Sequence, residues 1–274
     1  MARRLPLTQV CQVSKSFSQK GFPADVEPLS RGCHSFDVLQ RSSARMPIPR
    51  YAIYYTPTPE SPLDRFGAGV LGYDCFEAHD VARLPIHDIA PPILAILTVE
   101  PARYGFHATF KAPFRLGGAS EQDLLTAFNA FAATHRTVPV GPLEVACIGS
   151  FVVLRPAQPS AELEELAAAC VADFDVFRAP MAQGERERRR AGGLSARQLE
   201  LLERWGYPYV LNEFRFHMTL AGPVPDAQRA AIKTGLARAF EPLARDHLEI
   251  GAVSLMRQDD ARFRVLSRQR LKGR

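Results

Sequence analysis

The chain has 274 residues, of which 46% are hydrophobic and 23% charged, as in a globular protein with a sizeable core. No apolar run reaches the length of a membrane span, so no membrane partner is expected. The net charge of +5 does not predict a nucleic-acid surface on the folded body, because residues 1–50 hold eight basic and three acidic side chains while residues 51–274 hold 26 of each sign.

The cysteine pattern favours a reduced environment. The five cysteines are scattered, and no CxxC pair occurs, so neither a disulfide framework nor a zinc ribbon is indicated. The first residues contain arginines but no apolar segment followed by a small-residue cleavage site, so a secretory signal is not indicated. We therefore expect a cytoplasmic protein.

The first 46 residues differ from the rest of the chain. They are rich in Ser, Arg, Gln and Lys and show no sustained hydrophobic period, which predicts a disordered leader over 1–46. Met46 stands directly before a Pro-Ile-Pro-Arg stretch and the first convincing strand, so translation is hypothesised to start there. A single folded domain is expected over 47–274.

The first predicted element is a strand. The run YAIYYT at residues 51–56 is aromatic and β-branched, and Pro57 ends it. Residues 57–100 mix Gly, Pro and Asp with short apolar pieces and give no clear pattern. Within them, Ile93–Val99 follows a Pro-Pro break and predicts a short strand or helix.

An internal repeat dominates the remainder of the chain. Residues 103–156 and 213–270 each predict the order strand, helix, strand, strand, with helices that begin at Ser120 and Asp226. Such a repeat predicts two lobes related by a pseudo-two-fold axis, with equivalent strands facing each other. The predicted fold is α+β and bilobal, with two antiparallel sheets, outer helices and a cleft between the sheets.

A different segment separates the two repeats. Ser160–Val171 predicts a capped amphipathic helix, and the charge run Glu185–Arg190 is typical of a solvated helix face. Ser195, with Gln198 three residues later, predicts a capping box at the start of another helix. We expect a helical insertion over 174–212 that caps the cleft.

Two short motifs indicate chemistry. His107-Ala108-Thr109 and His217-Met218-Thr219 occur at equivalent points of the repeat. On a strand, side chains at i and i+2 point to the same face, so each motif presents an imidazole and a hydroxyl together. Two such strands in one cleft would offer two imidazoles and two hydroxyls to one small anion.

These groups match the needs of phosphodiester hydrolysis. One of His107 and His217 would serve as general base and the other as general acid, in an order that the sequence does not fix, because imidazole titrates near neutral pH. Thr109 and Thr219 would donate hydrogen bonds to the phosphoryl oxygens. The arrangement requires no metal and no other cofactor, and no HxH, HExxH or Asp-rich cluster accompanies either histidine.

Further substrate contacts are suggested by position. Strand alternation places Lys111 on the face of the first motif and Arg215 on the face of the second, where each cation would either bind phosphate or reach solvent at a strand edge. Tyr104 and Tyr209, with Tyr207, would either stack a base or sugar or pack in the core.

At these motifs the chain resembles the 2H phosphoesterase superfamily, over about residues 50–270. Four longer stretches resemble a bacterial branch described as phosphonate-metabolism proteins. They are RYAIYYTP (50–57), RYGFHATFKAPFRL (103–116), FDVFRAP (174–180) and RWGYPYVLNEFRFHMTL (204–220).

The resemblance implies a function. It implies metal-independent cleavage of a small cyclic phosphodiester by His107 and His217, with Thr109 and Thr219 at the phosphate, and a phosphonate link suggests 5-phosphoribosyl 1,2-cyclic phosphate. Two alternatives remain open: an enzyme that processes 2′,3′-cyclic phosphate ends of RNA, and a non-catalytic nucleotide- or RNA-binding module. RNA is the less favoured partner, because the body lacks net positive charge.

Overall fold

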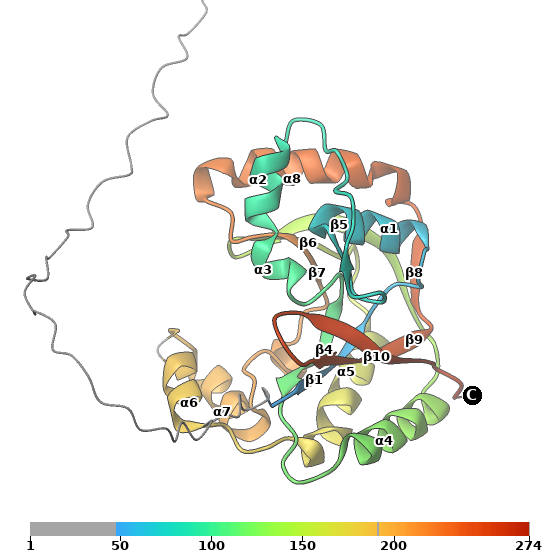
Figure 1. Ribbon diagram of the computed structural model, residues 1–274, viewed down its shortest axis with the longest axis vertical. Helices are drawn as coiled ribbons and strands as arrows, with labels where there is room; N and C mark the ends of the chain where they lie inside the picture. The colour runs from blue at the N-terminus through green and yellow to red at the C-terminus, as the bar shows by residue number, and fades with distance from the viewer. Residues whose placement is uncertain (1–47, 191, 274) are drawn as a thin grey trace, which may run out of the picture. The chain divides into compact units, whose positions relative to one another are not determined.

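The structure is a computed structural model that describes residues 48–190 and 192–273 (Figure 1). The strands are β1 (Arg50–Tyr55), β2 (Tyr73–Asp74), β3 (His79–Asp80), β4 (Ala108–Phe114), β5 (Val138–Ile148), β6 (Phe151–Pro156), β7 (Met218–Ala221), β8 (His247–Ile250), β9 (Ala252–Gln258) and β10 (Phe263–Arg270). The α-helices are α1 (Pro62–Leu71), α2 (Pro91–Leu97), α3 (Val99–Ala102), α4 (Glu121–Thr134), α5 (Ala161–Asp173), α6 (Gln183–Arg190), α7 (Ala196–Trp205) and α8 (Asp226–Phe240). Short 3₁₀ turns are η1 (Asp175–Phe177), η2 (Leu211–Glu213) and η3 (Glu241–Leu243).

Local signals account for the helices of the repeats and of the insertion. The hydroxyl of Ser120 accepts from the Asp123 backbone N–H while the Asp123 carboxylate accepts from the Ser120 backbone N–H, so α4 begins with a capping box. Ser160 and Ser195 cap α5 and α7 in the same local way. The charge run forms α6 without a buried residue. The predicted starts of these helices are therefore confirmed.

The fold is α+β with antiparallel pairing, as predicted, but its two sheets are joined. The strand order is β10-β9-β1-β4-β7-β6-β5-β8. Two four-stranded halves meet where β4 pairs with β7, at Ala108 and Met218. The first strands of the two repeats, β4 and β7, thus lie side by side in one sheet, whereas the last strands, β6 and β10, belong to different halves.

The two halves exchange strands and have their own helices. The half β10-β9-β1-β4 takes β4 from the first repeat and β9 and β10 from the second, and α4 and α5 pack against it. The half β7-β6-β5-β8 is covered by α8, α1 and α3. Figure 1 shows these two groups of helices on opposite sides of the strands. As a result, strand β4 beside the first motif lies next to strand β7 beside the second motif.

The sheet is strongly curled. Strands β8 and β9 are separated only by Gly251, yet β8 is the last strand at one end of the sheet and β9 is next to last at the other. A connection of one residue joins them only if the sheet bends back on itself. One large hydrophobic core fills this arrangement, and a small cluster of Val171, Leu201 and Val210 lies under α7.

The structure adds elements that the sequence analysis left unassigned. Residues 57–100 form α1, β2, β3, the whole of α2 and the first half of α3, so Ile93–Val99 is largely helical. The strand that begins near Leu248 breaks at Gly251 into β8 and β9. The predicted leader and start at Met46 lie outside the described residues. No helix within residues 48–190 or 192–273 has the length and apolarity needed to cross a membrane.

Candidate active site

The β4–β7 pair brings the two His-x-Thr motifs together. Each histidine stands one residue before its strand, and Ala108 faces Met218 as an antiparallel pair. In this register, neighbours of a pair lie across from each other, so His107 falls beside Thr219 and Thr109 beside His217. The Ala108 and Met218 side chains are fully buried, so the four motif side chains share the opposite side of the strands.

Both imidazoles are held in the same tautomer. His107 Nδ1 lies 2.8 Å from the Gly105 carbonyl oxygen, and His217 Nδ1 lies 2.7 Å from that of Arg215. Because a carbonyl only accepts, each Nδ1 carries the proton and each neutral ring keeps its Nε2 lone pair. His107 Nε2 lies 3.1 Å from the Thr109 hydroxyl, which donates to it. Nε2 is therefore the atom that each ring has for proton transfer.

Glycine at 105 is required for this carbonyl contact. Its φ of +73° lies in the left-handed region that favours glycine. A Cβ added there would also stand 2.5 Å from the Cys75 Cβ. The backbone that orients His107 thus depends on a residue without a side chain.

Burial lowers the pKa of both histidines. The His107 ring stacks on Tyr54 with centroids 3.8 Å apart and an interplanar angle of 19°. Burial lowers the pKa of His107 to about 4, although the Gly105 bond opposes this, and the neighbouring His217 lowers it further. Burial also lowers the pKa of His217, against the bond to Arg215. Both rings are half-buried and neutral at pH 7 in the free protein.

Tyr54 is a site residue that the sequence analysis missed. It pairs with Thr109 across β1 and β4, so both side chains lie on the face that carries the first motif. Burial raises the pKa of Tyr54 well above 10, so its hydroxyl stays protonated. The alternation in YAIYYT marks two faces of β1 but does not say which one meets the histidine, so no local signal could have identified it.

Tyr104 lies where it was predicted, next to the first motif. Its ring centroid is 6.1 Å from that of His107, and it stacks on Phe263 at 5.5 Å. Tyr209 is 47% exposed and meets Tyr207 edge-on at 5.6 Å. Burial raises the pKa of Tyr207, the guanidinium of Arg189 opposes this, and Tyr209 and Tyr104 raise it further. A substrate contact by Tyr209 stays a prediction.

The expected placement of Lys111 is wrong. Tyr54 pairs with Thr109 but Ile53 pairs with Lys111, so a β-bulge intervenes and Lys111 shares the face of Ile53, opposite to Thr109. Its Nζ donates to the Val171 carbonyl at 3.1 Å and to Asp175 at 3.0 Å. Strand alternation fails as a guide here because one extra residue reverses the side chains that follow it, up to the next irregularity between Ile53 and Tyr51.

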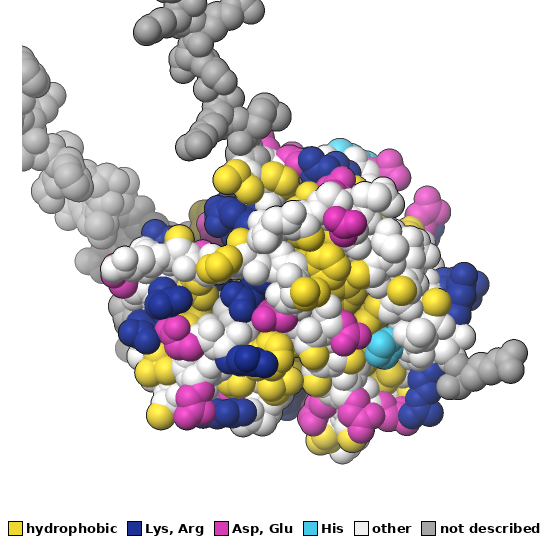
Figure 2. Space-filling model, turned by 90° about the horizontal axis from the view of Figure 1, so that it is seen from below, with side chains coloured by type: hydrophobic (Ala, Val, Ile, Leu, Met, Phe, Trp, Pro, Cys, Tyr) yellow, Lys and Arg dark blue, Asp and Glu magenta, His cyan; other side chains and the backbone are white. Residues whose placement is uncertain are grey.

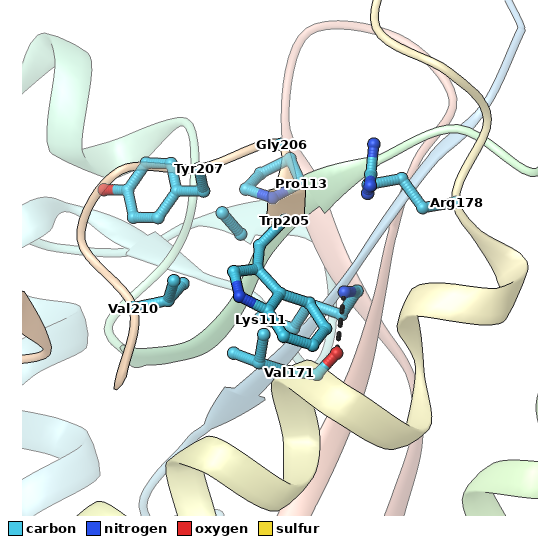
Figure 3. A pocket seen from close by; sticks show the side chains of 9 residues that line it. Lys111, Pro113, Val171, Arg178, Trp205, Gly206, Tyr207 and Val210 are labelled. Carbon is cyan, nitrogen blue, oxygen red and sulfur yellow. Dashed lines mark hydrogen bonds between the residues drawn. The ribbon is translucent and has the colours of Figure 1, made fainter. Parts of the chain in front are cut away.

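Figure 3 shows the surroundings of Lys111. Its ammonium turns toward the Val171 carbonyl, and Trp205, Tyr207 and Arg178 line the same small pocket. The space there is about 10 Å³, roughly enough for one water. The pocket is too small for a phosphate group, and Lys111 is part of a buried ion pair instead.

Arg215 is exposed and lies before β7 begins. The alternation of side chains along a strand therefore does not determine the face on which its side chain lies. Its carbonyl orients His217, and its guanidinium makes no ion pair within the described part of the chain. Phosphate binding by this guanidinium stays a prediction. In the described ranges, 48–190 and 192–273, no three His, Cys, Asp or Glu side chains form a group that could hold a metal ion.

Comparisons with known proteins give a family and two long relatives. The model of a family described as "Protein of unknown function (DUF1045)" matches residues 109–264. A protein of Janthinobacterium sp. (strain Marseille) named ribose 1,5-bisphosphate phosphokinase PhnN is 38% identical over 240 residues, 84% of this chain and 52% of that protein. A protein of the same name from Laribacter hongkongensis (strain HLHK9) is 37% identical over 191 residues, 69% of this chain and 43% of that protein. The chain thus spans about half the length of these relatives.

Among solved structures, the chain is similar to E. coli LigT in complex with 3′-AMP. The TM-score is 0.38 and the identity 11%, over 82% of this chain and 98% of LigT. A structure described as a phosphoesterase has a TM-score of 0.35 and 13% identity over the same shares.

Proposed function

We propose that this chain, which belongs to the DUF1045 family, is a phosphoesterase that hydrolyses a small cyclic phosphodiester, because one strand pair joins its two His-x-Thr motifs. The observation that carries the proposal is the Ala108–Met218 register, which sets two imidazoles and two hydroxyls on one side of adjacent strands. Both rings also keep Nε2 for proton transfer.

The proposed mechanism divides the proton transfers between the histidines. Nε2 of one ring accepts a proton from water as the water oxygen attacks phosphorus, and Nε2 of the other donates a proton to the departing ring oxygen. The P–O bond to that oxygen breaks, and the product is a phosphate monoester with a free hydroxyl. Charge that develops on the non-bridging oxygens is met by hydrogen bonds from Thr109 and Thr219 and by the guanidinium of Arg215.

The proposed substrate follows from the name of the relatives. That name specifies ribose 1,5-bisphosphate, and this compound forms when water opens 5-phosphoribosyl 1,2-cyclic phosphate by breaking the bond between phosphorus and O2. We therefore assign the leaving group as O2, with the phosphate kept on O1. The kinase reaction itself is not proposed for this chain, because its sequence contains no GxxxxGK[ST] phosphate-binding loop.

A substrate panel with EDTA present tests the proposal. We expect turnover of 5-phosphoribosyl 1,2-cyclic phosphate to ribose 1,5-bisphosphate, followed by ³¹P NMR, with slower turnover of 2′,3′-cyclic nucleotides. Preference for an oligoribonucleotide with a cyclic end would favour the RNA-processing alternative. Binding of all these compounds without turnover would favour a binding module, and loss of activity with the chelator would contradict the proton-transfer mechanism.

The pH dependence of the reaction follows from the lowered pKa values. The general base must be unprotonated and the general acid protonated, so kcat/KM should rise through a pKa of about 4 and fall again through a second pKa below the usual 6.5. In the complex, the bound anion favours the imidazolium form and raises both values, so the falling limb of kcat should lie at higher pH. Profiles of both parameters from pH 3 to 9 check this, and a kcat/KM optimum above pH 7 would contradict it.

A further inference from the structure

A cavity separate from the His-x-Thr motifs lies in the insertion. It has a volume of about 260 Å³, is partly open to solvent and is bordered by η1, the segment after it, α6 and α7. Its lining consists of three apolar residues and four charged ones: Pro180, Met181 and Leu202, and Asp175, Arg178, Arg186 and Glu203. Pockets of 300–1,000 Å³ hold drug-sized ligands, so this cavity suits a smaller charged group with a few carbon atoms.

The two carboxylates at the cavity are already engaged. Asp175 Oδ1 accepts from Lys111 Nζ at 3.0 Å and from Arg178 Nε at 2.8 Å, and Oδ2 accepts from Arg178 Nη2 at 3.2 Å. Burial would raise the pKa of Asp175, but the bonds from Arg178 and Lys111 outweigh it and the pKa lies below its usual range. Glu203 pairs with Arg190 at 2.9 Å and, more loosely, with Arg186 at 3.5 Å.

Positive charge therefore remains after these pairings. Two carboxylates hold four cations, since Asp175 binds Lys111 and Arg178 while Glu203 binds Arg190 and Arg186. The connected group carries a net charge of +2, which is the difference between four cations and two anions. Arg178 and Arg186 line the cavity together with both carboxylates, so the lining itself is balanced, and the two surplus cations, Lys111 and Arg190, belong to the same ion-pair network beyond it.

The two cavity arginines have donors left for a ligand. Arg178 is held by its paired bonds to Asp175 and by a bond to the Arg204 carbonyl at 3.1 Å, and its Nη1 has no hydrogen-bond partner among the described residues. Its side chain is only 18% exposed, so its direction is set by packing. Arg186 is 45% exposed, and its nearest approach to Glu203, through Nε, is a long 3.5 Å. One fixed and one adaptable guanidinium thus border the cavity.

We propose that this cavity is a binding site for a phosphate monoester group. A monoester carries a charge of about −1.5 to −2 at pH 7, which matches the surplus of the cluster. Guanidinium forks bind phosphate oxygens in pairs, and a fixed fork loses little freedom on binding. In the view from below in Figure 2, Lys and Arg side chains, with Asp and Glu side chains among them, lie toward the left, the side on which α6 and α7 lie in Figure 1.

Direct binding to the full chain tests the site without any need for turnover. Inorganic phosphate and ribose 5-phosphate are titrated by calorimetry into the wild type and into Arg186→Gln, and we expect affinity to fall on the order of tenfold. Arg186→Glu should remove binding altogether. Arg188→Gln is the matched control, because it makes the same charge change on α6 at an exposed residue that does not line the cavity.

Kinetic measurements distinguish two sources of the bound phosphate group. This part of the test rests on the proposed function. If the group is the distal phosphate of the substrate, Arg186→Gln should raise KM for 5-phosphoribosyl 1,2-cyclic phosphate and leave KM for a cyclic nucleotide without a second phosphate unchanged. If it is free phosphate or another metabolite, binding should fall while both KM values stay the same. Equal phosphate affinity in wild type, Arg186→Gln and Arg186→Glu would overturn the site, whatever the enzyme turns over.

Discussion

Replacement of His107 or His217 by alanine is expected to lower kcat/KM on a cyclic phosphodiester by on the order of 10²- to 10⁴-fold. Each ring holds its Nδ1 proton on a backbone carbonyl and offers Nε2 to the same region, so removal of either ring removes one of the two proton transfers. Steady-state rates with EDTA present measure the loss. Folding is checked separately by circular dichroism and urea unfolding.

The double variant shows whether the two rings act together. If each is needed for the same step, His107→Ala with His217→Ala should cost little more than either single change, because groups that act as a unit are strongly non-additive. Additive losses would indicate that the rings serve separate steps.

His135→Ala is the matched control for these variants. His135 Nδ1 also donates to a backbone carbonyl, that of Phe131 at 2.8 Å, and its ring stacks on Phe131 at 3.8 Å. It lies at the C-terminal end of α4 and is not part of either motif. Its replacement should leave kcat/KM unchanged. An equal loss in all three single variants would point to a general effect on folding and contradict the assigned roles.

Asp175→Ala is expected to destabilise the fold by about 3 kcal/mol, whereas Lys111→Met should change stability by less than about 1 kcal/mol. Without Asp175, the buried ammonium of Lys111 loses its counter-ion, and an unpaired buried charge is costly. Without Lys111, Asp175 keeps both bonds from Arg178, and methionine fills a similar volume. Urea unfolding at pH 7 measures both changes.

Two comparisons make this prediction specific. Glu144→Ala breaks the exposed pair with Arg155 and should cost no more than about 1 kcal/mol, because surface ion pairs contribute little. Lys111→Met should also leave KM for a cyclic nucleotide without a second phosphate within about twofold, since the ammonium faces α5 and η1 rather than the motifs. A large rise in KM would restore the phosphate-binding role that the bulge in β4 argues against.

Much of the secondary structure could be predicted because its causes are local. The caps at Ser120, Ser160 and Ser195 each depend on a hydrogen bond to a residue three positions along the chain. Segments whose stability comes from distant contacts were not predicted. The region from Pro57 to Ala102 carries mixed local signals, and its helices pack against one another, against α8 or against β7.

The candidate site divides in the same way. His107, Thr109, His217 and Thr219 could be chosen from the sequence because their i, i+2 spacing recurs in an internal repeat. Lys111 could not be placed, since a bulge depends on how β1 and β4 pair. Tyr54 and the Gly105 carbonyl were missed because stacking and carbonyl contacts follow from the folded geometry of separate segments.

From the order of residues alone came the α+β class, the repeat, the capped helices and the four motif side chains, since propensity, periodicity and capping act over a few residues. The joining of both halves at Ala108 and Met218, the face of Lys111, the tautomers of the histidines and the charged cavity of the insertion came from the fold. These features depend on strand register and on burial, which bring together residues as far apart as 110 positions and are set by the packing of the whole domain.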